Sequence, residues 1–400
     1  MIYPVRSRRY SPTSRGCRGR RRSPVAEDVA LVRVIERLEE AYPPRLAEHW
    51  DSVGLVCGDP AEPVRRALVC VDVTDDVVAA AIDRECQLIV AHHPLLLRGV
   101  DTVAASTPKG ALIHRLIRAG CALFTAHTNA DSARPGVSDA LADLLGLGDT
   151  VPLRPLPSGD LDKWVVMVPV DDASAVRSAM FAAGAGEIGD YRHCAWSVVG
   201  TGQFEPLPGA APAIGEIGGL SEVAEARVEM VASRRVREEV LASLRSAHPY
   251  EEPAFDVFEL AALPSGVGLG RVGELSEELS LREFADFVAS RLPTAPWGIR
   301  AAGDPQRRIR RVAVCGGAGD SLIDDAVRAA ADVYVTGDLR HHVVDEALRA
   351  GGPAFVDAGH WATEFPWCGS VAKMLTSLGV ETTVHSEPTD PFRLHGASAH

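Results

Sequence analysis

Two adjacent histidines, His92 and His93, stand directly after the apolar run at 87–91 and before Pro94. The run predicts a buried strand, and ligands of open α/β sheets bind just outside the carboxyl ends of such strands. Imidazole nitrogens suit zinc, iron, nickel and copper. Because neighbouring side chains point in different directions, one such pair could serve two ions. The alternative is a pair of loop histidines that bind nothing.

Two further histidines are each followed by a carboxylate four residues later. His127 precedes Asp131, and His360 precedes Glu364. A carboxylate can bridge two cations and hold them about 3.5–4 Å apart, as in two-metal hydrolytic sites. In a helix, a spacing of four residues puts both side chains on one face. The alternatives are an aspartate that caps a helix and an exposed histidine beside a surface glutamate.

Two other motifs lie later in the chain. Asp338, His341 and His342 could orient metal ligands, contact a substrate or cap a helix. The glycine-rich segment 315–320 follows a predicted strand and could hold a phosphate at a helix N-terminus. It is neither a Walker A loop nor a clean GxGxxG motif, so it favours a tight turn from strand to helix.

The elements that must position these residues follow an α/β order that occurs twice. Residues 67–92 align without gaps with residues 312–337, and both segments are predicted to form strand, helix and strand. Each copy continues into a further helix and strand, and then into a histidine followed by a carboxylate. Strands that alternate with helices indicate parallel sheets covered by helices. Two similar lobes that face each other would bring both histidine–carboxylate pairs to one cleft.

Proline- and glycine-rich stretches at 151–160 and 263–268 separate the two copies and mark an inserted segment. Its predicted order, strand–helix–strand followed by strand–helix–strand, is typical of a ferredoxin-like α/β sandwich. The overall prediction is therefore an α/β protein with a two-lobed core and an inserted sandwich. The predicted parts are a leader at 1–24, a first lobe at 25–154, the insert at 155–265 and a second lobe at 266–400.

Charge and composition exclude several classes of function. The chain has 400 residues, with 41 basic and 54 acidic side chains and a net charge of −13. The first 24 residues hold eight arginines and no acidic residue, which leaves a net charge of −21 on the remainder. So acidic a body should repel nucleic acid, and the arginine-rich start favours a disordered leader over a nucleic-acid tail.

Membrane insertion, secretion and disulfide bonding are not expected either. The chain has no apolar run of about 18 residues, so no membrane span is predicted. The leader lacks the apolar segment of a secretory signal. The eight cysteines are scattered without a CxxC motif, which favours buried thiols over disulfides or a zinc knuckle. We therefore expect a cytoplasmic protein.

Five motifs, in the same order, resemble those of the NIF3 family, and the similarity spans residues 28–385. They are Asp-Ser-Val-Gly-Leu at 51–55, Ala-His-His-Pro-Leu at 91–95, His-Thr-Asn-Ala-Asp at 127–131, Gly-Asp at 337–338 with His341 and His342, and Gly-His at 359–360 with Glu364. The insert resembles the PII/CutA-like domain of the longer members, through Ala-His-Pro-Tyr-Glu-Glu-Pro at 247–253 and the segment 225–229.

The resemblance implies a two-lobed core that holds two divalent cations, zinc, iron or manganese, in its cleft, and a hexameric ring of subunits. We expect His127 to orient a ligand or to move protons, because imidazole titrates near neutral pH. The residues that match the family's metal-ligand positions are His92, His93, Asp131, His360 and Glu364.

Members of the family are often labelled GTP cyclohydrolase 1 type 2. The label implies a metal-dependent hydrolase that opens the imidazole ring of GTP, a nucleotide, and releases formate. One alternative is a non-enzymatic metal-binding regulator or metal-trafficking protein, because PII-like sandwiches often sense small molecules. Another is a protein-interaction scaffold in which the histidines are incidental.

Overall fold

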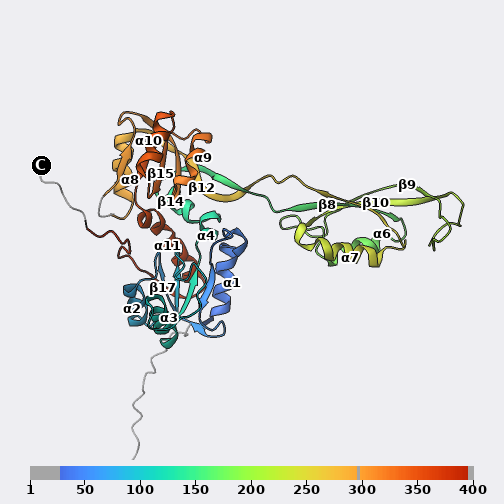
Figure 1. The fold of residues 1–400 in the computed structure, drawn as a ribbon, viewed down its shortest axis with the longest axis horizontal. Coiled ribbons are helices and arrows are strands. Elements are labelled where there is room, and N and C mark those ends of the chain that lie inside the picture. Colours follow the sequence, from blue (N-terminus) through green and yellow to red (C-terminus); the bar gives the residue numbers. More distant parts are fainter. Residues whose placement is uncertain (1–27, 295–297, 395–400) are drawn as a thin grey trace, which may run out of the picture. The chain divides into compact units, whose positions relative to one another are not determined.

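The computed structural model describes residues 28–294 and 298–394, so the arginine-rich leader predicted at 1–24 lies outside the described residues. The described chain is a mixed α/β fold with several sheets, as predicted. It divides into two compact units, whose elements are labelled in Figure 1. The first unit ends at Ala130 and resumes at Glu364, and the second runs from Asp131 to Thr363.

The first unit is built on a five-stranded sheet with the order β17-β4-β5-β6-β2. Four of the strands are parallel, and β2 runs antiparallel to β6. Parallel strands place their carboxyl ends at one edge of the sheet, and Asp72, His92 and His127 follow their strands at that edge. The strands are β2 (Gly54–Cys57), β4 (Arg66–Cys70), β5 (Leu88–Ala91), β6 (Ala122–Thr125) and β17 (Glu381–Val384).

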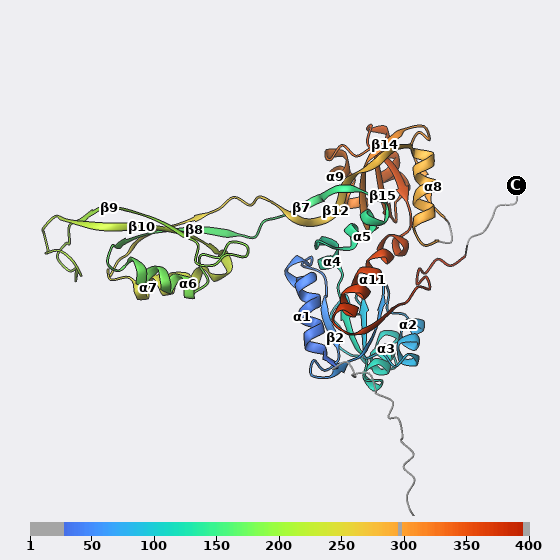
Figure 2. The same cartoon turned by 180° about the vertical axis from the view of Figure 1, so that it is seen from behind.

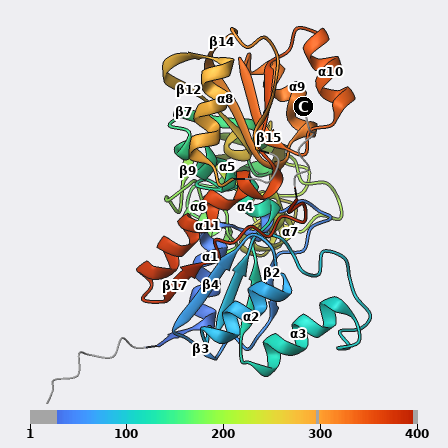
Figure 3. The ribbon, with the colours of Figure 1, turned by 90° about the vertical axis from the view of Figure 1, so that its left-hand side faces the viewer.

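Helices α2 (Asp75–Asp83) and α3 (Pro108–Arg118) cover one face of this sheet (Figure 3). Each begins at a threonine whose hydroxyl accepts a hydrogen bond from a backbone amide of the first turn, Thr74 in α2 and Thr107 in α3. Helix α1 (Leu31–Ala41) packs against β2. The short elements β1 (Val29–Ala30), β3 (Pro63–Val64) and η1 (Pro44–Leu46) complete this part.

Two helices cross the boundary between the units. Helix α4 (Thr128–Ser132) does so at Asp131, and helix α11 (His360–Ser377) does so in its first turn. In the first unit, α11 is fixed by the buried ring of Trp367. The centroid of this ring lies 5.2 Å from that of His92 and 5.7 Å from that of Tyr42.

The second unit contains a six-stranded sheet with the order β13-β16-β15-β14-β12-β7. Its centre, β14-β15-β16, is parallel, and the outer strands are antiparallel to their neighbours. The strands are β7 (Gly148–Pro157), β12 (Pro264–Ser280), β13 (Arg300–Ala302), β14 (Arg308–Ala318), β15 (Val333–Gly337) and β16 (Ala354–Asp357).

Helices cover both faces of this sheet, because the central strands are apolar on both sides. Val333 and Val335 face α5 (Val137–Leu144) and α8 (Leu281–Arg291), whereas Tyr334 faces the opposite set of helices. That set consists of η3 (Asp320–Leu322), α9 (Ile323–Arg328) and α10 (His341–Arg349).

A second, four-stranded antiparallel sheet lies between β7 and β12 in the chain. Its strands follow the order β11-β8-β10-β9, and helices α6 and α7 cover one face (Figure 2). Along the chain, strand–helix–strand occurs twice. The elements are β8 (Leu161–Pro169), α6 (Ala173–Ala182), β9 (Ala195–Phe204), β10 (Ser221–Ser233), η2 (Arg234–Val236), α7 (Arg237–Ala247) and β11 (Ala254–Glu259).

The two proline- and glycine-rich stretches, 151–160 and 263–268, both contain strand residues. Both stretches lie within or next to strands, β7 and β12, which pair with each other. Strand β7 contains Pro152, Pro155 and Pro157 but is the last strand of its sheet. An edge strand tolerates proline because one of its sides has no partner strand to receive its N–H groups.

The cysteines and the helices bear on the expected thiols and on membrane insertion. Each described cysteine is a free thiol, and most are buried, as predicted. Among the described residues, no helix has the length and the apolar character needed to cross a membrane.

A buried ion pair ties α5 to β12 in the second unit. The Arg271 guanidinium, fully buried, donates to both carboxylate oxygens of Asp139 at 2.7 Å. Its remaining N–H groups donate to the carbonyl oxygens of Gly268, Gly270 and Ala133. All five donors of the side chain therefore point at oxygen acceptors, which is how a buried arginine is accommodated.

We predict that Arg271→Met destabilises the protein by about 3–5 kcal/mol, because it leaves the Asp139 carboxylate buried without its partner. Chemical denaturation followed by circular dichroism measures the loss. The matched control is Arg310→Met, which removes an exposed ion pair with Glu274 and should cost about 0–1 kcal/mol. Equal shifts for the two variants would contradict this account.

Candidate metal centre

The two histidines that follow β5 present their Nε2 atoms to one glutamate. His92 is fully buried, and its Nδ1 donates to the carbonyl oxygen of Ala126 at 2.9 Å. The Nδ1 of His93 donates to Asp72 Oδ1 at 2.7 Å. The Nε2 atoms of His92 and His93 lie 3.5 and 3.1 Å from the two carboxylate oxygens of Glu364. Because a carbonyl and a carboxylate only accept, the Nδ1 atoms carry protons and Nε2 is the atom left to bind a ligand.

His127, which follows β6, is held in the same way. Its Nδ1 donates to Asp51 Oδ1 at 2.8 Å, and Asp51 Oδ2 accepts from the Thr128 amide at 3.0 Å and from the Thr128 hydroxyl. Burial by itself would raise the pKa of Asp51, but the hydrogen bonds from His127 and Thr128 hold that pKa well below its usual range. Asp51 is therefore an ionised, fixed acceptor.

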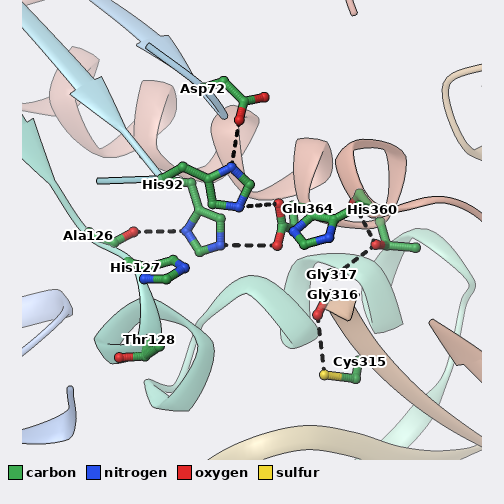
Figure 4. Close-up of polar contacts among 12 residues, drawn as sticks. Asp72, His92, Ala126, His127, Thr128, Cys315, Gly316, Gly317, His360 and Glu364 are labelled. Atoms are coloured by element: carbon green, nitrogen blue, oxygen red, sulfur yellow. Dashed lines mark hydrogen bonds and ion pairs between the residues drawn. The ribbon is translucent and has the colours of Figure 1, made fainter. Parts of the chain in front are cut away.

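The three imidazoles converge on one place. Each of His92, His93 and His127 offers one ring nitrogen, and these three atoms lie within 4.8 Å of one another. Figure 4 shows the His92 ring facing the Glu364 carboxylate, with the His127 ring on the other side of His92. Imidazole nitrogens together with a carboxylate oxygen form a donor set that zinc, iron and manganese accept. The residues present therefore fit a divalent metal ion.

Helix α11 carries both residues of the predicted pair His360 and Glu364. His360 begins the helix and Glu364 lies one turn later, and ligand atoms of the two lie within 4.8 Å of each other. The Nδ1 of His360 faces Asp338 Oδ2 at 2.7 Å. Asp338 thus contacts the His360 ring, and it has a left-handed backbone (φ 57°), which aspartate tolerates better than most residues.

The other predicted residues have simpler settings. Asp131 lies on α4, four residues after His127, and is partly buried. His341 and His342 begin α10, with ring centroids 5.1 Å apart. Of the glycine-rich segment 315–320, residues 315–318 end strand β14, and Gly319 connects it to η3. A Cβ at Gly319 would lie 2.2 Å from the Thr336 hydroxyl oxygen, so this connection is already filled.

Sequence reasoning missed the groups that hold the imidazoles. Asp51 and Asp72 were not proposed as site residues, and Ala126 acts through its backbone oxygen. Asp72 follows β4 just as His92 follows β5, so the rule that ligands gather at carboxyl ends of parallel strands could have identified it. A backbone carbonyl such as that of Ala126 leaves no signal in the sequence.

Comparison with known proteins agrees with the motifs and the fold. A sequence model of the Duf34/NIF3 (NGG1p interacting factor 3) family matches residues 29–391. The chain belongs to this family. A Mycobacterium tuberculosis protein named GTP cyclohydrolase 1 type 2 homolog is 56% identical to this NIF3 chain over 370 residues, which cover 92% of this chain and 97% of that protein.

More distant members cover the same length. A Bacillus subtilis protein with the same name is 40% identical over 374 residues, covering 92% of the NIF3 chain and 99% of its own length. The solved structure of a Bacillus cereus protein related to NIF3 superimposes with a TM-score of 0.71 at 37% identity, covering 91% of this chain and 99% of that one. Most of the segment 155–265 therefore lies within the aligned regions.

The charge on His93 distinguishes it from an ordinary histidine of the NIF3 chain. Burial alone would lower the pKa of His93, but the negative charges of Glu364 and Asp72 and their hydrogen bonds raise it to about 10. Without a metal, His93 is thus an imidazolium at neutral pH. A cation at Nε2 would have to displace this proton.

We predict that the metal-free protein loses stability as the pH rises from about 6.5 to about 10. The folded-state pKa of His93 lies above the ordinary value of 6.5, so its stabilisation is complete below 6.5 and disappears through 10. Urea denaturation in chelator at several pH values measures this. His93→Gln should flatten the alkaline decline, whereas His114→Gln, at an exposed position of α3, should follow the wild type. Identical curves for all three proteins would contradict the assignment.

Proposed function

We propose that this NIF3 protein binds two divalent cations and is a metal-dependent hydrolase. The observation that carries the proposal is the convergence of His92, His93 and His127, whose ligand atoms lie within 4.8 Å of one another. We assign the metal ligands by combining this geometry with the family motifs. They are His92, His93, Asp131, His360 and Glu364.

Glu364 would help to hold the cations, because its two oxygens face two different imidazoles, those of His92 and His93. Asp131 and His360 are assigned as ligands because of their positions on helices α4 and α11. Asp131 lies one turn from His127, and His360 lies one turn from Glu364. When bound, a pair of divalent cations supplies Lewis acidity and lowers the pKa of a shared water.

We assign His127 a role in proton transfer. Asp51 fixes its Nδ1–H and leaves Nε2 facing the same space as the other imidazoles. An ionised aspartate at Nδ1 also stabilises the imidazolium that forms when Nε2 takes up a proton. His127 would accept a proton from a water molecule or substrate and later return it to the leaving group.

The proposed substrate is GTP, by analogy with the printed name of the mycobacterial and Bacillus relatives. The reaction would be hydrolytic opening of the imidazole ring of the guanine base with release of formate. Metal binding without turnover would instead favour the alternative function, that of a metal-binding regulator or metal-trafficking protein.

We infer that the core consists of two related lobes. Strand β4, helix α2 and strand β5 of the first unit correspond in order and spacing to β14, η3 with α9, and β15 of the second. In both units these strands are parallel and are followed in the sheet by a third parallel strand, β6 or β16. The strand order of the four-stranded sheet supports the inference that residues 155–265 form a ferredoxin-like sandwich of the PII/CutA kind.

We retain two expectations that come from the family resemblance and the sequence. The protein is proposed to be cytoplasmic and to assemble as a homohexamer. Light scattering coupled to size-exclusion chromatography would give the subunit number directly.

We predict close to two transition-metal ions per chain in protein purified without added metal or chelator, because five ligands suffice for a dinuclear site. Elemental analysis by mass spectrometry measures the content. His93→Ala and Glu364→Ala should each lose most of the metal, since each removes a ligand. His114→Ala, which removes an exposed histidine, is the matched control and should keep it. Absence of metal even after incubation with zinc, manganese and iron would rule out the proposal.

We predict that metal-loaded protein releases formate from GTP and that His127→Ala lowers this rate by about 100-fold or more while keeping its metal, as expected for loss of a general acid–base group. Formate assay and elemental analysis on the same samples separate the two effects. Loss of metal in His127→Ala would instead make His127 a ligand. No formate from fully loaded wild type would exclude GTP and leave the metal site intact.

A further inference from the structure

The chain beyond the last strand returns to the candidate metal centre. Strand β17 pairs in parallel with β4, with Val384 opposite Val69, and the next amide, that of His385, donates to the Val69 carbonyl at 2.9 Å. Because the two strands are parallel, the chain leaves β17 at the edge where Asp72 follows β4. We call residues 385–390 the C-terminal strap.

The strap makes one specific contact with the groups that hold the imidazoles. The hydroxyl of Thr389 donates to Asp72 Oδ2, while the other oxygen of the same carboxylate, Oδ1, accepts from His93 Nδ1 at 2.7 Å. Thr389 and Asp72 are 317 residues apart in the sequence. Thr389 is buried, with 8% of its surface exposed, and the next residue, Asp390, is buried as well.

These contacts form a continuous chain from the strap to the site. It runs from the Thr389 hydroxyl through the Asp72 carboxylate to His93 Nδ1, and from His93 Nε2 to Glu364 Oε2 at 3.1 Å. The two links to Asp72 each have one chemically possible direction, because its carboxylate can only accept. The hydroxyl therefore fixes the rotation of the carboxylate, and the carboxylate fixes the ring of His93.

We propose that Thr389 is a positioning residue for His93 and that the C-terminal strap sets the metal affinity of the centre. The inference rests on the proposed metal site and deepens it. The strap acts by holding Asp72 in the orientation that keeps His93 Nδ1–H engaged and Nε2 aimed at Glu364. A site assembled from the carboxyl ends of β4, β5 and β6 is thus completed by a segment from the end of the chain.

Zinc affinity of the metal-stripped, full-length protein tests this, measured by competition with a chromophoric chelator. Asp72→Asn should weaken zinc binding by about 10–100-fold, the usual cost of losing a group that orients a ligand. Thr389→Val, which keeps the shape but removes the hydroxyl, should weaken it by up to about 10-fold. Thr389→Ser should restore near-wild-type affinity because it restores the donor.

Thr382→Val is the matched control, since Thr382 lies on β17 and its hydroxyl donates to the Val380 carbonyl, away from Asp72. Thermal unfolding of the metal-free variants separates positioning from folding. Weaker binding by Thr389→Val with an unchanged melting temperature, and rescue by serine, supports the proposal. Equal affinity of Thr389→Val and the wild type overturns it, as does failure of serine to rescue. No zinc uptake by the wild type would overturn the metal site itself, which is a distinguishable result.

Discussion

The candidate site depends on the oxygen atoms that hold Nδ1 of its histidines. The Ala126 carbonyl, Asp72 and Asp51 hold His92, His93 and His127 at 2.7–2.9 Å. Asp338 lies at 2.7 Å from His360 in the same manner. An imidazole whose Nδ1–H is engaged has its ring orientation fixed and its Nε2 lone pair exposed, which is the form that binds a cation. Histidines without these oxygens would rotate and would hold protons on either nitrogen.

The topology of the first unit provides two of these oxygens, those of Asp72 and Ala126, which follow β4 and β6. Parallel strands end at a common edge, so residues that follow β4, β5 and β6 reach one place although helices separate these strands in the sequence. Burial then makes the arrangement specific. His92 is fully enclosed, Glu364 is almost so, and Trp367 packs against the His92 ring, so α11 is held at one rotation about its axis. The contacts that pack α11 into the core therefore also fix the geometry of the site.

Much of this could be predicted from the sequence, for physical reasons. Apolar runs that end in His92 and His127 mark buried parallel strands, and the repeated strand–helix–strand order predicts the sheet that joins them. Strand β7 could not be predicted, because its three prolines read as a linker unless its place at the edge of a sheet is known. Backbone acceptors such as that of Ala126 are invisible in residue types. The contact of Thr389 with Asp72 depends on where β17 pairs, which the sequence does not reveal.

X-ray absorption spectroscopy of the zinc-loaded protein tests the central claim most directly, because it reports the atoms around the metal without assuming any activity. The account predicts nitrogen and oxygen donors at about 2.0–2.2 Å, with imidazole scattering beyond them. It also predicts a second zinc at about 3.5–4 Å. A spectrum of hydrated zinc with neither imidazole scattering nor a second metal would contradict it.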